Sequence, residues 1–381
     1  MRKIGKEVSF LKAGKGNLRN GESTFLRLKD GRIMFAYTEF LGDDWLDHAT
    51  ARISAIFSFD EGESWSAPRV IVQKPGNAQN IMSPSLVRLT DGGVGLIYSR
   101  KDVLENGGVS CMPVFSRSDD EGESFGEASY IDFPLGYYCT VNDAAFVSKN
   151  GRIYVPASYH GECYDAFCKM KTAPKTAPGK IMLAYSDDNG KSWHVHEKTF
   201  SSPYAEDKIG LAEPGFLELA DGTLWTWART AYGHQYQTLS YDGGMSWTPL
   251  EPNFRFTTPD APMRVKHIGS YVAAVYNPVA YNCTRTDKEM WGSPRRTPLV
   301  VSISRDGGVS FTDRAWSFAN GGAAHLVANT YFLEDDTSES YCYPSILEAS
   351  DGFLVSYYHS DGNEACLNAS KIVKVYYSEL D

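Results

Sequence analysis

Short stretches of alternating apolar and polar residues recur along the chain, and most of them flank a turn that contains glycine. STFLRLKDGRIMFAYT, PSLVRLTDGGVGLIYS and PGFLELADGTLWTWAR each consist of an apolar strand, an Asp-Gly-type turn and a second apolar strand. Such alternation is typical of strands with one buried face, and the turn residues favour a tight hairpin. Three further segments, DAAFVSKNGRIYVPAS, APMRVKHIGSYVAAVY and PSILEASDGFLVSYYH, follow the same pattern, so six hairpins are predicted.

An eight-residue motif, Ser-x-Asp-x-Gly-x-Ser-Trp/Phe, follows five of these hairpins. It occupies 58–65, 118–125, 186–193, 240–247 and 304–311, at intervals of 60, 68, 54 and 64 residues. Self-similarity at such a period indicates a propeller or a repeat array. The aspartate can accept backbone N–H groups within a turn, and the glycine supplies a positive φ, so we interpret the motif as structural.

Hairpins and motifs together predict one all-β domain over residues 1–381, a six-bladed β-propeller of four-stranded antiparallel blades. Six blades of roughly 60 residues account for nearly all of the 381 residues. The pattern contains no helical domain and no long linker.

One register in the hairpins is polar in all six blades, although an apolar strand follows it each time. It lies eight positions before the first turn residue. The first strand of each propeller blade lines the central channel, so equivalent positions should surround one mouth of that channel. These positions are Glu22, Ser83, Asn142, Glu213, Asp260 and Tyr343.

Composition narrows the partners. The net charge of -10 argues against non-specific nucleic-acid binding, and an anionic ligand would need a local cluster of Arg or Lys. No apolar run approaches the ~20 residues of a membrane span, and the N-terminal MRKIGKEVSF contains no signal-peptide core. With seven irregularly spaced cysteines, a cytoplasmic protein with free thiols is expected, or a secreted or periplasmic one if a leader has been removed. No cofactor or metal motif is found, so neither is expected; the oligomeric state is not indicated.

Over its whole length the chain resembles the exo-sialidases (neuraminidases), whose propellers carry this motif as the Asp-box. The blade-four segment AEPGFLELADGTLWTWAR looks like the family's Glu-Pro motif followed by an Arg, which implies roles for Glu213 and Arg229. Tyr343, in YCYPSILEASDG, matches the nucleophile. Arg296, in RRTPLVVSISRDGG, matches a carboxylate-binding Arg, with Arg295 as its competitor.

Blade one departs from the family. Asp47 matches the acid/base loop, where Asp43 and Asp44 are alternatives, but the family's Arg-Ile-Pro is missing. The stretch NLRNGESTFLRLKDG resembles a broader group of sialidase-like propellers whose first blade reads Arg-Asn-x-Glu. Arg19 is shifted by about two residues from the family position, and we expect it to pair with Glu22.

The resemblance implies a retaining glycoside hydrolase that cleaves a terminal acidic sugar, with sialic acid as the first candidate. A neutral Tyr nucleophile avoids repulsion by the sugar's carboxylate, and a neighbouring Glu can take its proton. Arg19, Arg229 and Arg296 would hold that carboxylate. Glu22, Asn142, His160 and Asp260 are further candidates for substrate contacts. Two alternatives remain open: a hydrolase or lyase for another acidic sugar, with Tyr as base and His as acid in an elimination, and a non-catalytic glycan-binding propeller.

Overall fold

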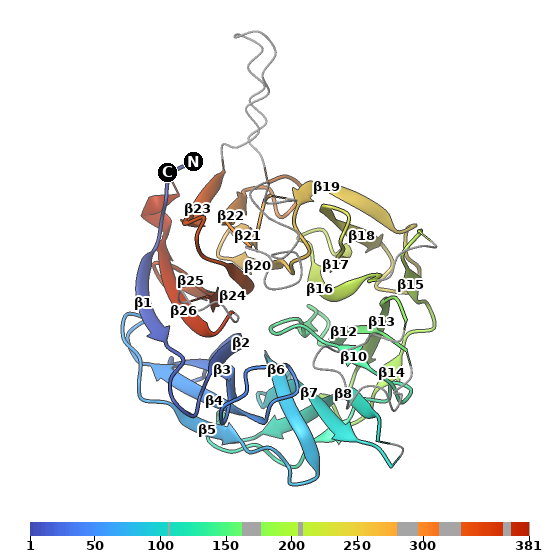
Figure 1. Cartoon of the computed structure of the whole chain (residues 1–381). Helices are drawn as coiled ribbons and strands as arrows, with labels where there is room; N and C mark the ends of the chain where they lie inside the picture. The colour runs from blue at the N-terminus through green and yellow to red at the C-terminus, as the bar shows by residue number, and fades with distance from the viewer. Residues whose placement is uncertain are drawn as a thin grey trace.

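The structure, a computed structural model, describes residues 1–105, 107–161, 177–204, 209–279, 296–311, 329–360 and 367–380. Six antiparallel sheets stand around a central axis, as Figure 1 shows. The predicted all-β six-bladed propeller is therefore confirmed. Helix in the described part is limited to one 3-10 turn, η2 (Tyr377–Glu379). No helix among the described residues is long and apolar enough to cross a membrane.

Four blades are regular: their strands follow one another in chain order, and the first strand lies nearest the axis. Blade one contains β2 (Arg19–Arg27), β3 (Ile33–Phe40), β4 (Ala51–Ser58) and β5 (Arg69–Val72); blade two contains β6 (Ala78–Arg88), β7 (Val94–Val103), β8 (Val109–Ser118) and β9 (Ser129–Tyr130). Blade four contains β16 (Ala212–Glu218), β17 (Leu224–Arg229), β18 (His234–Ser240) and β19 (Glu251–Thr257); blade five contains β20 (Arg264–Ile268), β21 (Tyr271–Tyr276), β22 (Leu299–Ser304) and β23 (Thr330–Glu334).

Blades three and six deviate from this plan. In blade three, the first strand is split into β10 (Tyr138–Cys139) and β11 (Phe146–Val147), which both pair with β12 (Ile153–Tyr159). The fourth strand is split as well, because β14 (His194–Val195) and β15 (Phe200–Ser201) both pair with β13 (Lys180–Ser186). In blade six, β24 (Tyr341–Ala349), β25 (Gly352–His359) and β26 (Ala369–Tyr376) are completed by β1 (Lys6–Leu11) from the start of the chain. This closure joins segments from the two ends of the chain in one sheet, with β1 as its outer strand.

Each eight-residue motif forms the turn between the third and fourth strands of its blade. In the first one, Asp60 accepts the amide and hydroxyl hydrogens of Ser64 at 2.9 and 2.5 Å, and the hydroxyl of Ser58 at 2.9 Å. The same three bonds recur in the other four motifs, at Asp120, Asp188, Asp242 and Asp306. The motif follows β4, whereas Asp47 precedes it, so the two lie at opposite ends of the blade. The interpretation of the motif as a structural turn is confirmed.

Apolar clusters fill the space between neighbouring blades. Trp193, the aromatic residue that ends the third motif, is 5 % exposed and packs edge-on against Phe115 of blade two, with ring centroids 5.5 Å apart. These contacts between sheets hold the blades in fixed positions around the axis, so that residues from different blades can build one site at its mouth.

Candidate active site

Four residues of the predicted register have an unusual backbone. Glu22, Ser83, Glu213 and Tyr343 have positive φ values of 50°, 58°, 48° and 55°, and each lies where the pairing of its innermost strand shifts at a β-bulge. A left-handed conformation at a residue with a side chain costs about 1 kcal/mol or more and is concentrated at functional sites. A bulge re-aims a side chain, and all four side chains line the same cavity.

The other two register positions behave differently. In blade three the left-handed residue is Asp143 (φ 59°), one position later than predicted. Asn142 is fully buried and donates from Nδ2 to the backbone oxygens of Ser23 (2.7 Å) and Tyr343 (3.4 Å), so its amide braces the neighbouring strands and does not line the cavity. Asp260 of blade five lies just before β20 and accepts a hydrogen bond from Arg229 Nε.

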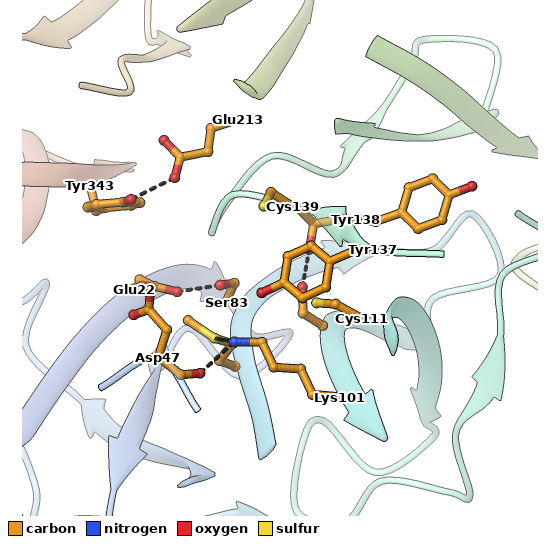
Figure 2. A pocket seen from close by; sticks show the side chains of 13 residues that line it. Glu22, Asp47, Ser83, Lys101, Cys111, Tyr137, Tyr138, Cys139, Glu213 and Tyr343 are labelled. Atoms are coloured by element: carbon orange, nitrogen blue, oxygen red, sulfur yellow. Dashed lines mark hydrogen bonds between the residues drawn. The ribbon is translucent and has the colours of Figure 1, made fainter. Parts of the chain in front are cut away.

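The cavity opens to solvent at the channel mouth, and its empty volume, open solvent included, is about 420 Å³. Figure 2 shows the side chains that surround it, which come from blades one, two, three, four and six. The lining residues are Glu22, Asp47, Met82, Ser83, Ser99, Lys101, Cys111, Tyr137, Tyr138, Cys139, Thr140, Glu213 and Tyr343. Its mixed polar and apolar lining suits a small polar ligand such as one sugar unit.

Tyr343 and Glu213 are directly bonded. Tyr343 Oη donates to Glu213 Oε1 at 2.6 Å, although the two residues are 130 positions apart. Arg229 Nη1 donates to the other carboxylate oxygen at 2.6 Å and lies 3.4 Å from Tyr343 Oη. Burial raises the pKa of Tyr343 well above its ordinary value, and the charge of Glu213 adds to that rise, against the opposing charges of Arg229 and Arg296. The phenol is therefore neutral, with its proton already directed at a carboxylate.

Two arginines flank Tyr343. Arg229 is held between Glu213 and Asp260. Arg296 is 7 % exposed, donates from Nη1 to Cys342 Sγ at 3.0 Å, and lies 5.6 Å from the centroid of the Tyr343 ring. Within the described residues the buried Nε of Arg296 has no acceptor. An unsatisfied buried guanidinium N–H beside the phenol is suited to an incoming carboxylate. Arg295, the competing candidate, lies outside the described residues.

Arg19 is engaged on all three nitrogens. Nη2 donates to Glu22 Oε1 at 2.9 Å, Nη1 to Asp47 Oδ1 at 2.6 Å, and Nε to Tyr358 Oη at 2.8 Å. The guanidinium also lies 4.5 Å from the centroid of the Phe40 ring. The expected Arg19–Glu22 ion pair is present, and Arg19 is not free to bind a substrate carboxylate in this arrangement.

The two carboxyl groups on Arg19 have opposite pKa shifts. Burial raises the pKa of Glu22 to about 7, despite the opposing charge of Arg19. For Asp47, burial acts in the same direction, but the charges of Arg19 and Lys101 outweigh it and hold the pKa below its ordinary value. The Asp47 side chain is 59 % exposed. A general acid near neutral pH needs a raised pKa, which the charges around Asp47 do not give it.

Three further sequence-based candidates do not line the cavity. His160 is fully buried within blade three, where Nε2 lies 3.0 Å from Ser158 Oγ, so the expectation that it would contact substrate at the mouth is not supported. Asp43 and Asp44 do not line the cavity either; both are exposed, and Asp44 Oδ1 accepts the Leu46 amide.

Sequence reasoning missed Lys101, which lines the cavity. Its side chain is buried, and Nζ donates to the Asp47 backbone oxygen at 2.5 Å. Lys101 lies near the end of the second strand of blade two, two residues beyond Ser99. Ser99 pairs with Met82 next to the bulge of its blade, as Arg229 pairs with Ala212 in blade four. Lys101 is therefore at the same end of its strand as Arg229, which the repeat could have indicated. Tyr137, which lies just before β10 in blade three, had no comparable signal.

Comparison with known proteins supports the same architecture. Residues 47–356 match the family of BNR repeat-like domains. A search of curated protein sequences finds no significant match. Among solved structures, a protein of unknown function from Dyadobacter fermentans is 17% identical, with a TM-score of 0.69, over 97% of this chain and 99% of that chain.

Two sialidases are also similar in fold. The Hadza microbial sialidase Hz136 is 12% identical, with a TM-score of 0.68, over 96% of this chain and 67% of its own. The leech intramolecular trans-sialidase, complexed with 2,7-anhydro-Neu5Ac, is 13% identical, with a TM-score of 0.68, over 100% of this chain and 71% of its own. Identities this low establish the fold alone. The chain belongs to the BNR repeat-like domain family and is a sialidase-like six-bladed propeller.

Proposed function

We propose that this propeller is a retaining glycoside hydrolase that removes a terminal acidic sugar, with Tyr343 as the nucleophile and Glu213 as its base. The observation that carries the proposal is the 2.6 Å hydrogen bond from Tyr343 Oη to Glu213 Oε1 at the wall of the cavity. A phenol with a raised pKa is a poor nucleophile alone, and a carboxylate already bonded to its proton is the activation it needs.

The reaction has two displacements. In the first, Tyr343 Oη attacks the anomeric carbon, its proton passes to Glu213 Oε1, and the bond to the leaving oxygen breaks as an acid protonates that oxygen. In the second, water attacks the same carbon, the conjugate base of the acid takes its proton, and Tyr343 leaves with the proton returned by Glu213. Two inversions at one carbon give net retention.

The charges of the site favour an anionic sugar. A carboxylate on the anomeric carbon would repel a carboxylate nucleophile, whereas neutral Tyr343 avoids that repulsion. Arg229 and Arg296 both lie close to Tyr343 and supply positive charge that favours such a carboxylate, although Arg229 is also paired with Glu213 and Asp260. Sialic acid is the first candidate substrate because of the family resemblance. A different acidic sugar is the second candidate, since Arg19 is already occupied by Glu22 and Asp47.

The elimination alternative, with a histidine as acid, has less support, because the described residues that line the cavity include no histidine and His160 is buried in blade three. A purely binding propeller would not need a neutral phenol bonded to a carboxylate, since unreacted carbohydrate is held by hydroxyl-directed hydrogen bonds and aromatic contacts.

A panel of 4-methylumbelliferyl glycosides, beginning with the sialoside and continuing with uronides, tests the proposal. Wild type should release the fluorophore from at least one acidic glycoside, and Tyr343→Phe should abolish that release. Tyr98→Phe is the matched control, because Tyr98 is buried among apolar side chains of blades one and two and does not line the cavity. Turnover of neutral glycosides alone, or full activity of Tyr343→Phe, would contradict the proposal.

A further inference from the structure

We propose that Glu22, and not Asp47, is the carboxyl group that protonates the leaving oxygen and then deprotonates the attacking water. This inference rests on the proposed function. It assigns a catalytic role to a residue that departs from the sialidase pattern in blade one, at the position where the chain carries Arg-Asn-x-Glu.

The position of Glu22 suits that role. Its side chain is 5 % exposed and lines the cavity together with Tyr343 and Glu213. In Figure 2 it lies between Tyr343 on one side and Asp47 on the other, with Ser83 beside it. Its left-handed backbone, φ 50°, lies at a bulge of β2, and this strained conformation directs the side chain into the cavity.

Glu22 and Asp47 share the single guanidinium of Arg19, and we assign the protonated form to Glu22 and the ionised form to Asp47. A guanidinium carries one positive charge, and both Glu22 and Asp47 are bonded to it. Asp47 is the more exposed of the two, with Lys101 near it as a second cation, so Asp47 is the one that stays ionised. Paired carboxyl groups whose surroundings drive their pKa values apart divide into an acid and a base.

The charged groups around Glu22 come from every side of the cavity. Arg19 and the Ser83 hydroxyl favour the carboxylate, whereas burial and the charges of Asp47 and Glu213 favour the protonated form. Tyr343, on the facing strand, is neutral. The protonated form prevails up to a pH of about 7, the pKa that burial gives Glu22.

A protonated Glu22 also prepares the site for an anion. The site then holds four cations and three ionised carboxylates among the described residues: Arg19, Lys101, Arg229 and Arg296 against Asp47, Glu213 and Asp260. Protonation of Glu22 removes one negative charge from this group, which favours an anionic substrate.

The proton transfers balance. As Tyr343 attacks, the Glu22 hydroxyl gives its proton to the glycosidic oxygen, the anomeric C–O bond breaks with its electron pair on that oxygen, and Glu22 becomes a carboxylate. Arg19, 2.9 Å away, stabilises that new charge and acts as a positioning residue. Glu22 then removes a proton from the water that attacks the tyrosyl-bound sugar, which restores the starting state.

The test compares Glu22→Gln with Asp47→Asn on two substrates of the same sugar, a 4-methylumbelliferyl glycoside and an alkyl glycoside. Because the alkyl leaving group needs protonation more, Glu22→Gln should reduce kcat/KM on the alkyl glycoside by about 10²–10⁴-fold and on the umbelliferyl glycoside by far less. The fall of wild-type kcat/KM above a pH of about 7 should vanish in Glu22→Gln and persist in Asp47→Asn. Sodium azide should restore turnover of Glu22→Gln on the umbelliferyl glycoside and yield a glycosyl azide of retained configuration, an outcome that a merely structural defect would not give.

The inference is overturned if Asp47→Asn loses the alkaline fall and yields the azide product while Glu22→Gln behaves as wild type. Should Glu22→Gln fail to fold, Glu22→Asp replaces it; this variant is expected to keep an alkaline fall while losing at least about tenfold on the alkyl glycoside, and wild-type rates on both substrates would overturn the inference. These results concern the acid alone. Absence of turnover by wild type across the whole panel, or full activity of Tyr343→Phe, overturns the proposed function and the inference with it.

Discussion

Replacement of Glu22 by glutamine should change how the stability of the fold depends on pH. Glu22 is 5 % exposed, and its neighbours are the Arg19 guanidinium and the Ser83 hydroxyl. Gln is neutral at every pH and nearly the same size, so the substitution removes the titration while retaining most of the packing. The difference in unfolding free energy between the two proteins therefore isolates one carboxyl group.

The size of the effect follows from the pKa shift. Burial raises the pKa of Glu22 from 4.5 to about 7, so the native state holds a proton that the unfolded chain releases. The resulting stabilisation is fully present below pH 4.5 and is lost as the pH rises through about 7. At 1.36 kcal/mol per pKa unit, the loss across this range is about 3 kcal/mol.

Urea unfolding of wild type and Glu22→Gln at pH values from 4.5 to 8, followed by tryptophan fluorescence, measures this difference. Wild type should lose about 3 kcal/mol relative to Glu22→Gln between the lower pH and pH 7, and the difference should stay constant above that. Parallel curves over the whole range would mean that Glu22 is ionised in the folded protein, and the reasoning would be refuted.

Other substitutions test separate parts of the account. Asp188→Ala removes the hydrogen bonds that Asp188 accepts from Ser192 N (2.9 Å), Ser192 Oγ (2.6 Å) and Ser186 Oγ (2.8 Å). It should therefore lower the unfolding free energy by roughly 1–3 kcal/mol and leave kcat unchanged. Loss of kcat at an unchanged melting temperature would contradict a purely structural turn. Glu213→Gln should lower kcat by about 10²–10⁴-fold on every substrate of the panel, including those with good leaving groups, because it removes the base of the nucleophile; a loss limited to poor leaving groups would assign Glu213 to the acid step instead. Since Arg19 is occupied by Glu22 and Asp47, cleavage of a simple sialoside should be slow or absent; a kcat/KM above about 10⁴ M⁻¹s⁻¹ would show that the departure in blade one is harmless.

Repetition is what made the fold predictable. Five copies of one turn motif and six hairpins contain the same information several times over, so irregularities in single blades do not hide the architecture. The closure of blade six by β1 was not predicted, because KEVSFL resembles any short strand and its partner β26 lies more than 350 positions away. Pairing between chain ends is set by the circular arrangement of the blades and leaves no local pattern.

The site was predictable where backbone register determines side-chain direction. Glu22, Glu213 and Tyr343 share a register and a left-handed bulge, and they line one cavity. Register counting failed in blade three, where the split first strand places the left-handed residue at Asp143 instead of Asn142.

The protonation states could not be predicted from the sequence. Asp47 belongs to a loop that resembles the acid/base loop of the sialidases, but its pKa depends on Arg19 and Lys101, which lie 28 and 54 positions away. A pKa is a property of burial and neighbouring charge, and both arise only when the blades have assembled. The same holds for the acid role that we assign to Glu22.

The most direct test of the central claim is to trap the sugar on the protein. A fluorinated glycosyl fluoride of the acidic sugar that the panel identifies forms the first covalent bond quickly and releases it slowly. Proteolysis and tandem mass spectrometry then locate the added mass. We expect one sugar on the phenolic oxygen of Tyr343 in wild type and none in Tyr343→Phe; a sugar attached to any other side chain, or a hydrolysis product of inverted configuration with no adduct, would contradict Tyr343 as the nucleophile.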